Sequence, residues 1–326
     1  MNILRFFKAT PTPLIGIDIG FSAIKLLSLS KVTTGYKIES YQIEPLPLNS
    51  VVEKNIKSVT EVSKSIYQAL MKAKTEIRCV ACAVPGASVV TRIIQTDASY
   101  NDEQINEQIN VEAHQYLPIP LEEVYYDFTI LGPLKNHSTL KEVYLAAARQ
   151  ESVDSRVAAM TEAGLKTTIV DIESLAVERA FSLIAKQLPF LGKTPIVALI
   201  DIGEMITTTH VFKKGRSIYS RDQVFGENKG TESETVVKQI IHALQLFRSS
   251  SEEEQIDCIV LAGGGSLLKG LLSLTQEKTG IQTLIINPFL NMAISEKVEK
   301  TSLFSNSTRM LTCLGLALRT FDGQTD

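Results

Sequence analysis

Short apolar runs of strand length recur along the chain, and two of them are nearly alike. Residues 14–26 read LIGIDIGFSAIKL and residues 197–209 read VALIDIGEMITTT. In both, an apolar run ends in Asp-Ile-Gly and a second extended segment follows, a pattern that predicts two strands joined by a tight turn. Because Asp18 and Asp201 lie 183 residues apart, the pair predicts two related lobes and not a short repeat.

The segments that follow these two similar stretches, 14–26 and 197–209, also match each other. After the first come AIKLLSLS, a KVTTGY turn and KIESYQIEPL; after the second come TTTHVF, a KKGR turn and SIYSRDQVF. Each lobe is therefore predicted to open with three antiparallel strands. Helical patterns follow over residues 61–74 and 232–248, the second with Val236, Ile240 and Leu244 on one face.

The stretch between the lobes alternates helices and strands of its own. Its pattern predicts an α+β subdomain inserted into the first lobe, with helices over 102–115 and 152–163 and strands over 125–131 and 142–148. A strand over 166–171, a helix over 174–187 and a Pro- and Gly-containing hinge then lead to the second lobe. The predicted domains are an N-terminal amphipathic segment (1–13), the first lobe (14–84 and 166–195), the insertion (85–165) and the second lobe (196–326, with a reduced subdomain around 227–254).

Composition and charge narrow the class of protein. Hydrophobic residues make up 44% and charged residues 21% of the chain, as in soluble globular proteins. A net charge of −3 provides no basic field to hold nucleic acid. No apolar run approaches the roughly 20 residues of a membrane span, and four cysteines in 326 residues make no disulfide framework, so a reducing cytoplasm is expected. The start, MNILRFFKAT, is expected either to touch an anionic membrane or to fold back onto the first lobe.

The first Asp-Ile-Gly turn carries residue types that suit a phosphate site. A glycine in the turn, Gly20, lets backbone amides approach a phosphate, and Lys25 supplies a positive charge nearby. A carboxylate at the strand end, such as Asp18, can hold Mg²⁺ through its bound water. Taken alone, Asp-Ile-Gly is more often an ordinary strand turn. Two such hairpins facing one cleft would hold a polyphosphate from both sides.

A third candidate element is the glycine run Gly263, Gly264 and Gly265, which follows an apolar strand at 259–262. Bare backbone at the end of a strand lets a flat base or a phosphate rest against it. The run is not a Walker loop, because no Gly-Lys-Ser or Gly-Lys-Thr follows. It is not a Rossmann fingerprint either, and a plain strand–helix turn is the competing interpretation.

In this order the three elements resemble the actin-like ATPase superfamily, whose members have a bilobed, ribonuclease H-like α/β fold. The flanking sequence is similar to the PilM family of type IV pilus assembly, over nearly the whole chain. The stretches that carry this similarity are IGIDIGFSAIKLLSLS, YQIEPLPLNSVVEKNI, VEAHQYLPIPLEEVYYDF, VDIESLAVERAF, SIYSRDQVFG, IVLAGGGSLLKGL and CLGLALRTFD. The resemblance implies an insertion of the FtsA type within the first lobe. Compared with relatives, the subdomain of the second lobe is expected to be shortened.

The resemblance also implies roles for individual residues around ATP and Mg²⁺. It assigns Glu173 to positioning the attacking water, with a plain surface glutamate as the alternative, and it makes Asp18 and Asp201 indirect ligands of Mg²⁺ through water. The residues implied to bind nucleotide are Asp18, Gly20, Ser22 and Lys25 in the first loop, Asp201, Gly203 and Thr207 in the second, and Gly263, Gly264 and Gly265 at the adenosine.

Three departures from the family pattern weaken the expected nucleotide site. Phe21 and Met205 stand where relatives carry small or hydroxyl residues, and the chain passes from Gly226 to the helix at 232 in a few residues. A shorter wall around adenosine loses contacts and admits water. ATP binding is therefore expected to be weakened, and ATP hydrolysis is not expected.

By resemblance, the chain is expected to be a cytoplasmic adaptor at the inner face of the bacterial inner membrane. It would bind the N-terminal cytoplasmic tail of PilN in a groove between the insertion and the first lobe, and link it to the pilus motor ATPases. Whether the chain forms a homodimer is left open. The alternatives are an active ATPase or small-molecule kinase of the same superfamily, and an FtsA-like division protein that polymerises.

Overall fold

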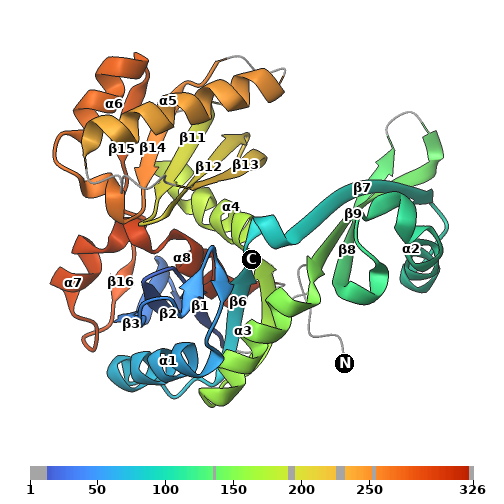
Figure 1. The fold of residues 1–326 in the computed structure, drawn as a ribbon, viewed down its shortest axis with the longest axis horizontal. Helices are drawn as coiled ribbons and strands as arrows, with labels where there is room; N and C mark the ends of the chain where they lie inside the picture. The colour runs from blue at the N-terminus through green and yellow to red at the C-terminus, as the bar shows by residue number, and fades with distance from the viewer. Residues whose placement is uncertain (1–12, 135–136, 190–194, 225–231, 252–254, 323–326) are drawn as a thin grey trace.

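Two twisted sheets stacked one above the other, with a third small sheet projecting sideways, make up the computed structural model (Figure 1). The structure describes residues 13–134, 137–189, 195–224, 232–251 and 255–322. The N-terminal segment 1–12 and parts of the predicted hinge and of the reduced subdomain lie outside these residues. None of the helices in the described ranges is both long and apolar enough to cross a bilayer.

The first lobe is a six-stranded sheet in the order β10-β6-β1-β2-β3-β16. Its first three strands are antiparallel, as predicted, because each is joined to the next by a tight turn. A small hairpin of β4 and β5 precedes helix α1. The elements are β1 (Ile15–Ile19), β2 (Ala23–Val32), β3 (Gly35–Pro45), β4 (Val51–Val52), β5 (Asn55–Ile56), α1 (Val59–Ala73), β6 (Cys79–Val84), β10 (Lys166–Ile172) and β16 (Ala293–Ile294).

The second lobe repeats this arrangement in the strand order β13-β12-β11-β14-β15. The three antiparallel strands again come first, and two parallel strands follow, so β11 takes the place of β1 and β14 that of β6. This match confirms the duplication predicted from the two similar Asp-Ile-Gly segments. The elements are β11 (Ile196–Ile202), β12 (Ile206–Lys213), β13 (Arg216–Val224), α5 (Ser233–Ser250), β14 (Cys258–Ala262), α6 (Leu271–Thr279) and β15 (Gln282–Ile285).

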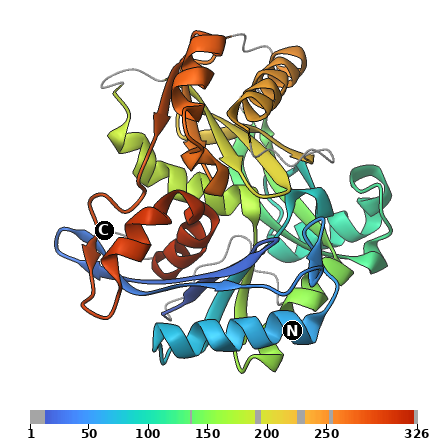
Figure 2. The same cartoon turned by 60° about the vertical axis from the view of Figure 1, so that its left-hand side comes forward.

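Helices α4 (Glu173–Ile184) and α8 (Leu311–Ala317) lie between the two sheets (Figure 2). Apolar side chains from both helices join one buried cluster with strands of both lobes. In it, Phe181 of α4 stacks on Phe212 of β12, with ring centroids 4.0 Å apart. The two lobes therefore share a continuous core through this pair of helices.

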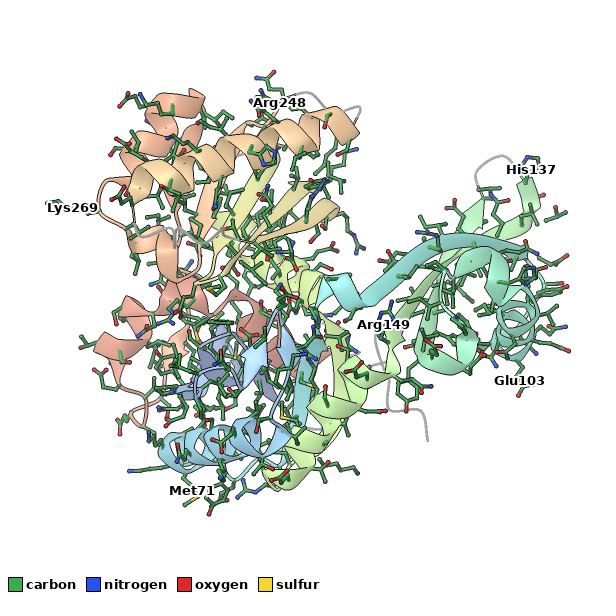
Figure 3. All side chains as sticks on the ribbon, viewed as in Figure 1. Met71, Glu103, His137, Arg149, Arg248 and Lys269 are labelled. Carbon is green, nitrogen blue, oxygen red and sulfur yellow. The ribbon has the colours of Figure 1, made fainter. Side chains whose placement is uncertain are left out.

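The insertion is a three-stranded antiparallel sheet, in the order β7-β9-β8, that stands away from both lobes (Figure 3). Its strands are β7 (Val89–Asp97), β8 (Val124–Leu134) and β9 (His137–Arg149). Helix α2 (Asp102–Tyr116) covers one face and buries Ile105 and Ile109 against it. The outer strand β7 was not predicted, because its pattern of partly exposed residues lacks a clean alternation.

Helix α3 (Gln150–Glu162), which the sequence places inside the insertion, packs on the first lobe instead. Its buried Val153, Ala159 and Met160 belong to the core formed by β1, β6 and α1. The C-terminal elements also differ from the predicted boundary. β16 pairs with β3, and the buried side chains of α8 pack against β1 and β2, so the chain returns to the first lobe after β15. Helix α7 (Lys300–Ser305) lies on this return path.

Candidate functional site

The two Asp-Ile-Gly hairpins have the same local geometry. In the first, Asp18 is paired in register with Lys25, and the Gly20 amide donates to the Ala23 carbonyl at 3.0 Å. In the second, Asp201 is paired with Thr208, and the Gly203 amide donates to the Ile206 carbonyl, also at 3.0 Å. A pseudo-equivalent pair of turns is therefore built into the two lobes.

Both turns need glycine because the chain doubles back tightly on itself. A Cβ atom at Gly20 would lie 2.9 Å from the Ala23 carbonyl oxygen, and one at Gly203 would lie 2.6 Å from that of Ile206. The third loop is packed against the second hairpin, since a Cβ at Gly263 would collide with the Asp201 carboxylate. These glycines keep backbone, and not side chain, at the surface of the site.

The three loops open onto one cleft of about 510 Å³ between the lobes. Asp18 and Asp201 therefore face a shared space, as the duplicated pattern predicts. The residues that line the cleft are Asp18, Ile19, Gly20, Phe21, Ser22, Ala23, Lys25, Lys54, Glu173, Val177, Asp201, Ile202, Gly203, Glu204, Met205, Ile206, Thr208, His210, Gly263, Gly264, Gly265, Leu268, Arg309 and Thr312.

Every site residue named from the sequence lines this cleft except Thr207. Thr207 is 1% exposed, and the next residue of the same strand, Thr208, lines the cleft, so the side chain of Thr207 points to the opposite face of the sheet. The cleft receives Thr208 instead, whose hydroxyl donates to the Asp222 carboxylate at 2.7 Å. Phe21 and Met205, the two departures, lie in the lining as well. Their effect on a nucleotide stays a prediction.

An ion pair sits at the mouth of the first hairpin. The Lys25 ammonium lies 2.7 Å from the Asp18 carboxylate, and both side chains are largely buried. Burial alone lowers the pKa of Lys25, but the charge and hydrogen bond of Asp18 and the nearby charge of Asp201 bring that pKa above its ordinary value. The lysine is therefore a permanent cation, held by its own strand partner.

For Asp201, burial outweighs the nearby charges in setting the pKa. Burial raises its pKa to about 6, Lys25 opposes the rise, and the neighbouring Asp18 carboxylate adds to it. A cation entering the cleft would favour the ionised form of this group. Carboxylates at two strand ends that face one cleft are the donor set of a Mg²⁺ held through water. No group of three His, Cys, Asp or Glu residues within the described ranges is arranged to ligate a metal directly.

We expect the Asp201→Asn variant to become more stable relative to the natural protein as the pH rises from 4 to 7. An aspartate pKa near 6 in the folded state lies above the value of about 4 in the unfolded chain. The folded state then binds more protons in this window, so the carboxylate costs stability as it ionises, on the order of 2 kcal/mol. Urea unfolding at several pH values measures the difference. Parallel stability curves for the two proteins would contradict the shift.

Lys54, Thr208 and Arg309 are among the cleft residues that sequence reasoning did not name. Lys54, from the β4–β5 turn, reaches Glu173 and the Asp222 carboxylate of the second lobe. Arg309 lies beside the glycine loop, its guanidinium 3.4 Å from the position of a Cβ at Gly264. Thr208 had a usable signal, because the offset of 183 residues that relates Asp18 to Asp201 also relates Lys25 to Thr208. Lys54 lies in one of the stretches similar to the PilM family, YQIEPLPLNSVVEKNI, but nothing in its pattern points to the cleft, and Arg309 stands in no quoted motif.

Two matching sheets whose first hairpins and a glycine loop face one interlobe cleft define a protein of the actin-like ATPase fold. The family model for the type IV pilus assembly protein PilM matches residues 16–234 and 232–321. The chain belongs to the PilM family.

Comparison with solved structures agrees on the fold. A chain of a PilM-PilN type IV pilus biogenesis complex matches with a TM-score of 0.78 and 24% sequence identity, over 96% of this chain and 100% of that one. The ethanolamine utilization protein EutJ from Carboxydothermus hydrogenoformans matches with a TM-score of 0.53 and 13% identity, over 97% and 94% of the two chains. At these identities the likeness concerns the fold.

Proposed function

We propose that this protein is a cytoplasmic adaptor of type IV pilus assembly that binds the N-terminal tail of PilN at the inner face of the inner membrane. Membership of the PilM family carries the proposal. The full-length likeness to a chain of a PilM-PilN complex supports it, because the insertion and both lobes are covered. On this proposal the adaptor links the membrane proteins of the pilus to its cytoplasmic motor ATPases.

The insertion offers a surface that suits an extended peptide. In the described part of the chain, β7 and β8 are the outer strands of its sheet, with backbone groups along their outer edges. On the face away from α2, Ile93 is 59% exposed and pairs in register with Tyr144 of β9. A tail that adds to a strand edge gains backbone hydrogen bonds, and apolar side chains beside it supply selectivity.

Fluorescence anisotropy with a labelled PilN tail peptide tests the proposal. We expect saturable binding to the full chain, weakened at least about tenfold in Ile93→Glu, since a buried charge at an apolar contact costs more than 1.4 kcal/mol. Leu290→Glu is the matched control, because Leu290 is 63% exposed in the loop before β16. A folded protein that does not bind at high micromolar concentration would refute the adaptor. Equal affinities for both variants would place the tail elsewhere.

We further propose that the cleft retains weak binding of ATP with Mg²⁺ and does not hydrolyse it. The two hairpin turns, the glycine loop and the paired carboxylates support binding, and Phe21 and Met205 in the lining oppose it. Nucleotide in the cleft would then tilt the lobes and alter the surface offered to the tail. Calorimetric titration with Mg-ATP tests this. Tight binding with phosphate release would favour the alternative of an active ATPase or kinase.

A further inference from the structure

The β4–β5 hairpin directs a lysine into the cleft by an unusual turn. Its two central residues, Glu53 and Lys54, have φ values of 48° and 62°. Side chains other than glycine, asparagine and aspartate rarely adopt this left-handed conformation, which costs about 1 kcal/mol or more per residue. Such a turn persists only where its surroundings hold it, and Lys54 lines the cleft as a result.

A buried arginine fixes the base of this lysine. Arg156 of α3 is 1% exposed and donates to the Lys54 carbonyl at 2.8 Å and to the Ala83 carbonyl at 2.7 Å. It also donates to the Ser152 carbonyl at 2.9 Å. The Lys54 backbone is therefore tied to both β6 and α3.

The Lys54 ammonium connects the two lobes. It lies 2.7 Å from the Glu173 carboxylate at the start of α4 and 3.0 Å from the Asp222 carboxylate on β13 of the second lobe. Thr208 of β12 donates to the other oxygen of Asp222 and orients it. The three side chains are about one-fifth exposed, so solvent and salt screen their attraction less than at an open surface.

The Lys54 ammonium faces two carboxylates, Glu173 and Asp222, and Glu173 also interacts with the charge of the buried Arg156. Lys25, the other lysine of the cleft, is already held by Asp18. Burial tends to lower the pKa of Lys54, yet Glu173 and Asp222 raise it well above its ordinary value, so the ammonium stays charged at every cellular pH. An incoming polyanion would repel both carboxylates and attract the lysine between them.

We propose that Lys54 is the switch of the cleft: without ligand it clamps the second lobe to the first through Asp222, and a polyphosphate entering the cleft draws its ammonium away and releases the clamp. The inference rests on the proposed binding of nucleotide for its second half only. The clamp itself is a property of the ligand-free protein. Asp222 and a polyphosphate in the cleft therefore compete for the Lys54 ammonium.

The control for this clamp lies on the same strand. Arg216 of β13 also reaches α4, with its guanidinium 3.2 Å from the Glu178 carboxylate. Its side chain is 85% exposed and does not line the cleft, and exposed pairs contribute little to stability. Arg216→Gln therefore removes a similar bond between β13 and α4 without touching the clamp.

Energy transfer between dyes on α1 and α5 measures the separation of the lobes. Met71 and Arg248, labelled at the bottom and the top of the two stacked lobes in Figure 3, are exposed sites for Met71→Cys and Arg248→Cys. Cys79→Ser removes the one native thiol in the described residues that is not fully buried. Without ligand, we expect a longer and broader distance in Asp222→Asn and in Lys54→Met, and no change in Arg216→Gln. If the first two variants keep the natural distance, the clamp is overturned.

Titration with inorganic triphosphate tests the release. We expect the natural protein to shift towards the distance of Asp222→Asn, the Lys54→Met variant to bind at least about tenfold more weakly, and Asp222→Asn to bind more tightly, because a competing carboxylate is gone. Binding without a shift in distance would refute the switch. If triphosphate and Mg-ATP both fail to bind, the proposed nucleotide site fails, while the ligand-free comparison still decides on the clamp.

Discussion

Replacing Gly315 with alanine should destabilise the protein by about 3 kcal/mol or more. The substitution removes no contact, so the whole effect comes from the added methyl group. Gly315 lies in α8 where this helix touches α4. An added methyl group would fall on the backbone carbonyl of Ala176 and 2.8 Å from the Ala176 Cα atom. Backbone cannot rotate aside, so the two helices would have to separate. Because both sheets rest on this pair, the strain reaches the shared core.

Thermal unfolding measures the loss, which corresponds to a fall in Tm of roughly 4 °C or more for a chain of this size. Gly86→Ala is the matched control, because Gly86 has negative φ and nothing lies within 4 Å of its Cβ position. That variant should stay within about 0.5 kcal/mol of the natural protein. If both variants unfold at the same temperature, the close approach of α8 to α4 is wrong.

Replacing Arg156 with methionine is expected to cost about 3 kcal/mol. The carbonyls of Lys54, Ala83 and Ser152 accept hydrogen bonds from this one guanidinium. An apolar side chain would remove this donor from the Lys54 and Ala83 carbonyls, at about 1–3 kcal/mol each before water or rearrangement relieves the loss. The Ser152 carbonyl would still accept from the Ser155 hydroxyl at 3.3 Å. Burial lowers the pKa of Arg156, partly offset by the charge of Glu173.

Chemical denaturation measures the stability of Arg156→Met, and a second arginine variant shows whether the loss is specific to the buried site. Arg78 also donates to two backbone carbonyls, of Thr75 and Ile77, but it is exposed. Because water can replace its hydrogen bonds, Arg78→Met should cost less than about 0.5 kcal/mol. We also expect Arg156→Met to free the β4–β5 turn, so that interlobe separation changes as in Lys54→Met. A variant as stable as the natural protein would show that the three carbonyls find other partners.

The sequence predicts the two hairpins, the three antiparallel strands that open each lobe and the facing of Asp18 and Asp201, because these features repeat at a fixed offset. The same offset identifies Thr208, whereas matching the second loop to a family pattern pointed to Thr207, one residue away. On a strand, an error of one residue moves the side chain to the other face. Duplication within one chain was the more accurate guide here than resemblance.

Other parts of the cleft could not be predicted from local pattern. The β4–β5 turn has two residues with positive φ, as in a type I′ turn, but uses Glu53 and Lys54 where asparagine and glycine are usual. Arg156 reads as a solvent-facing helix residue until α3 is placed on the first lobe. The return of α8 to β1 is a contact between opposite ends of the chain, and no short motif specifies it.

Strand β9 has a mechanical consequence for the insertion. Its 13 residues begin in the projecting sheet. Near the C-terminal end of the strand, Ala146 and Ala148 are buried in the core of the first lobe. A single continuous strand therefore connects the insertion to the first lobe, and apolar packing holds its C-terminal end. A force applied to the described part of the insertion would therefore be transmitted along β9 to the core of the first lobe.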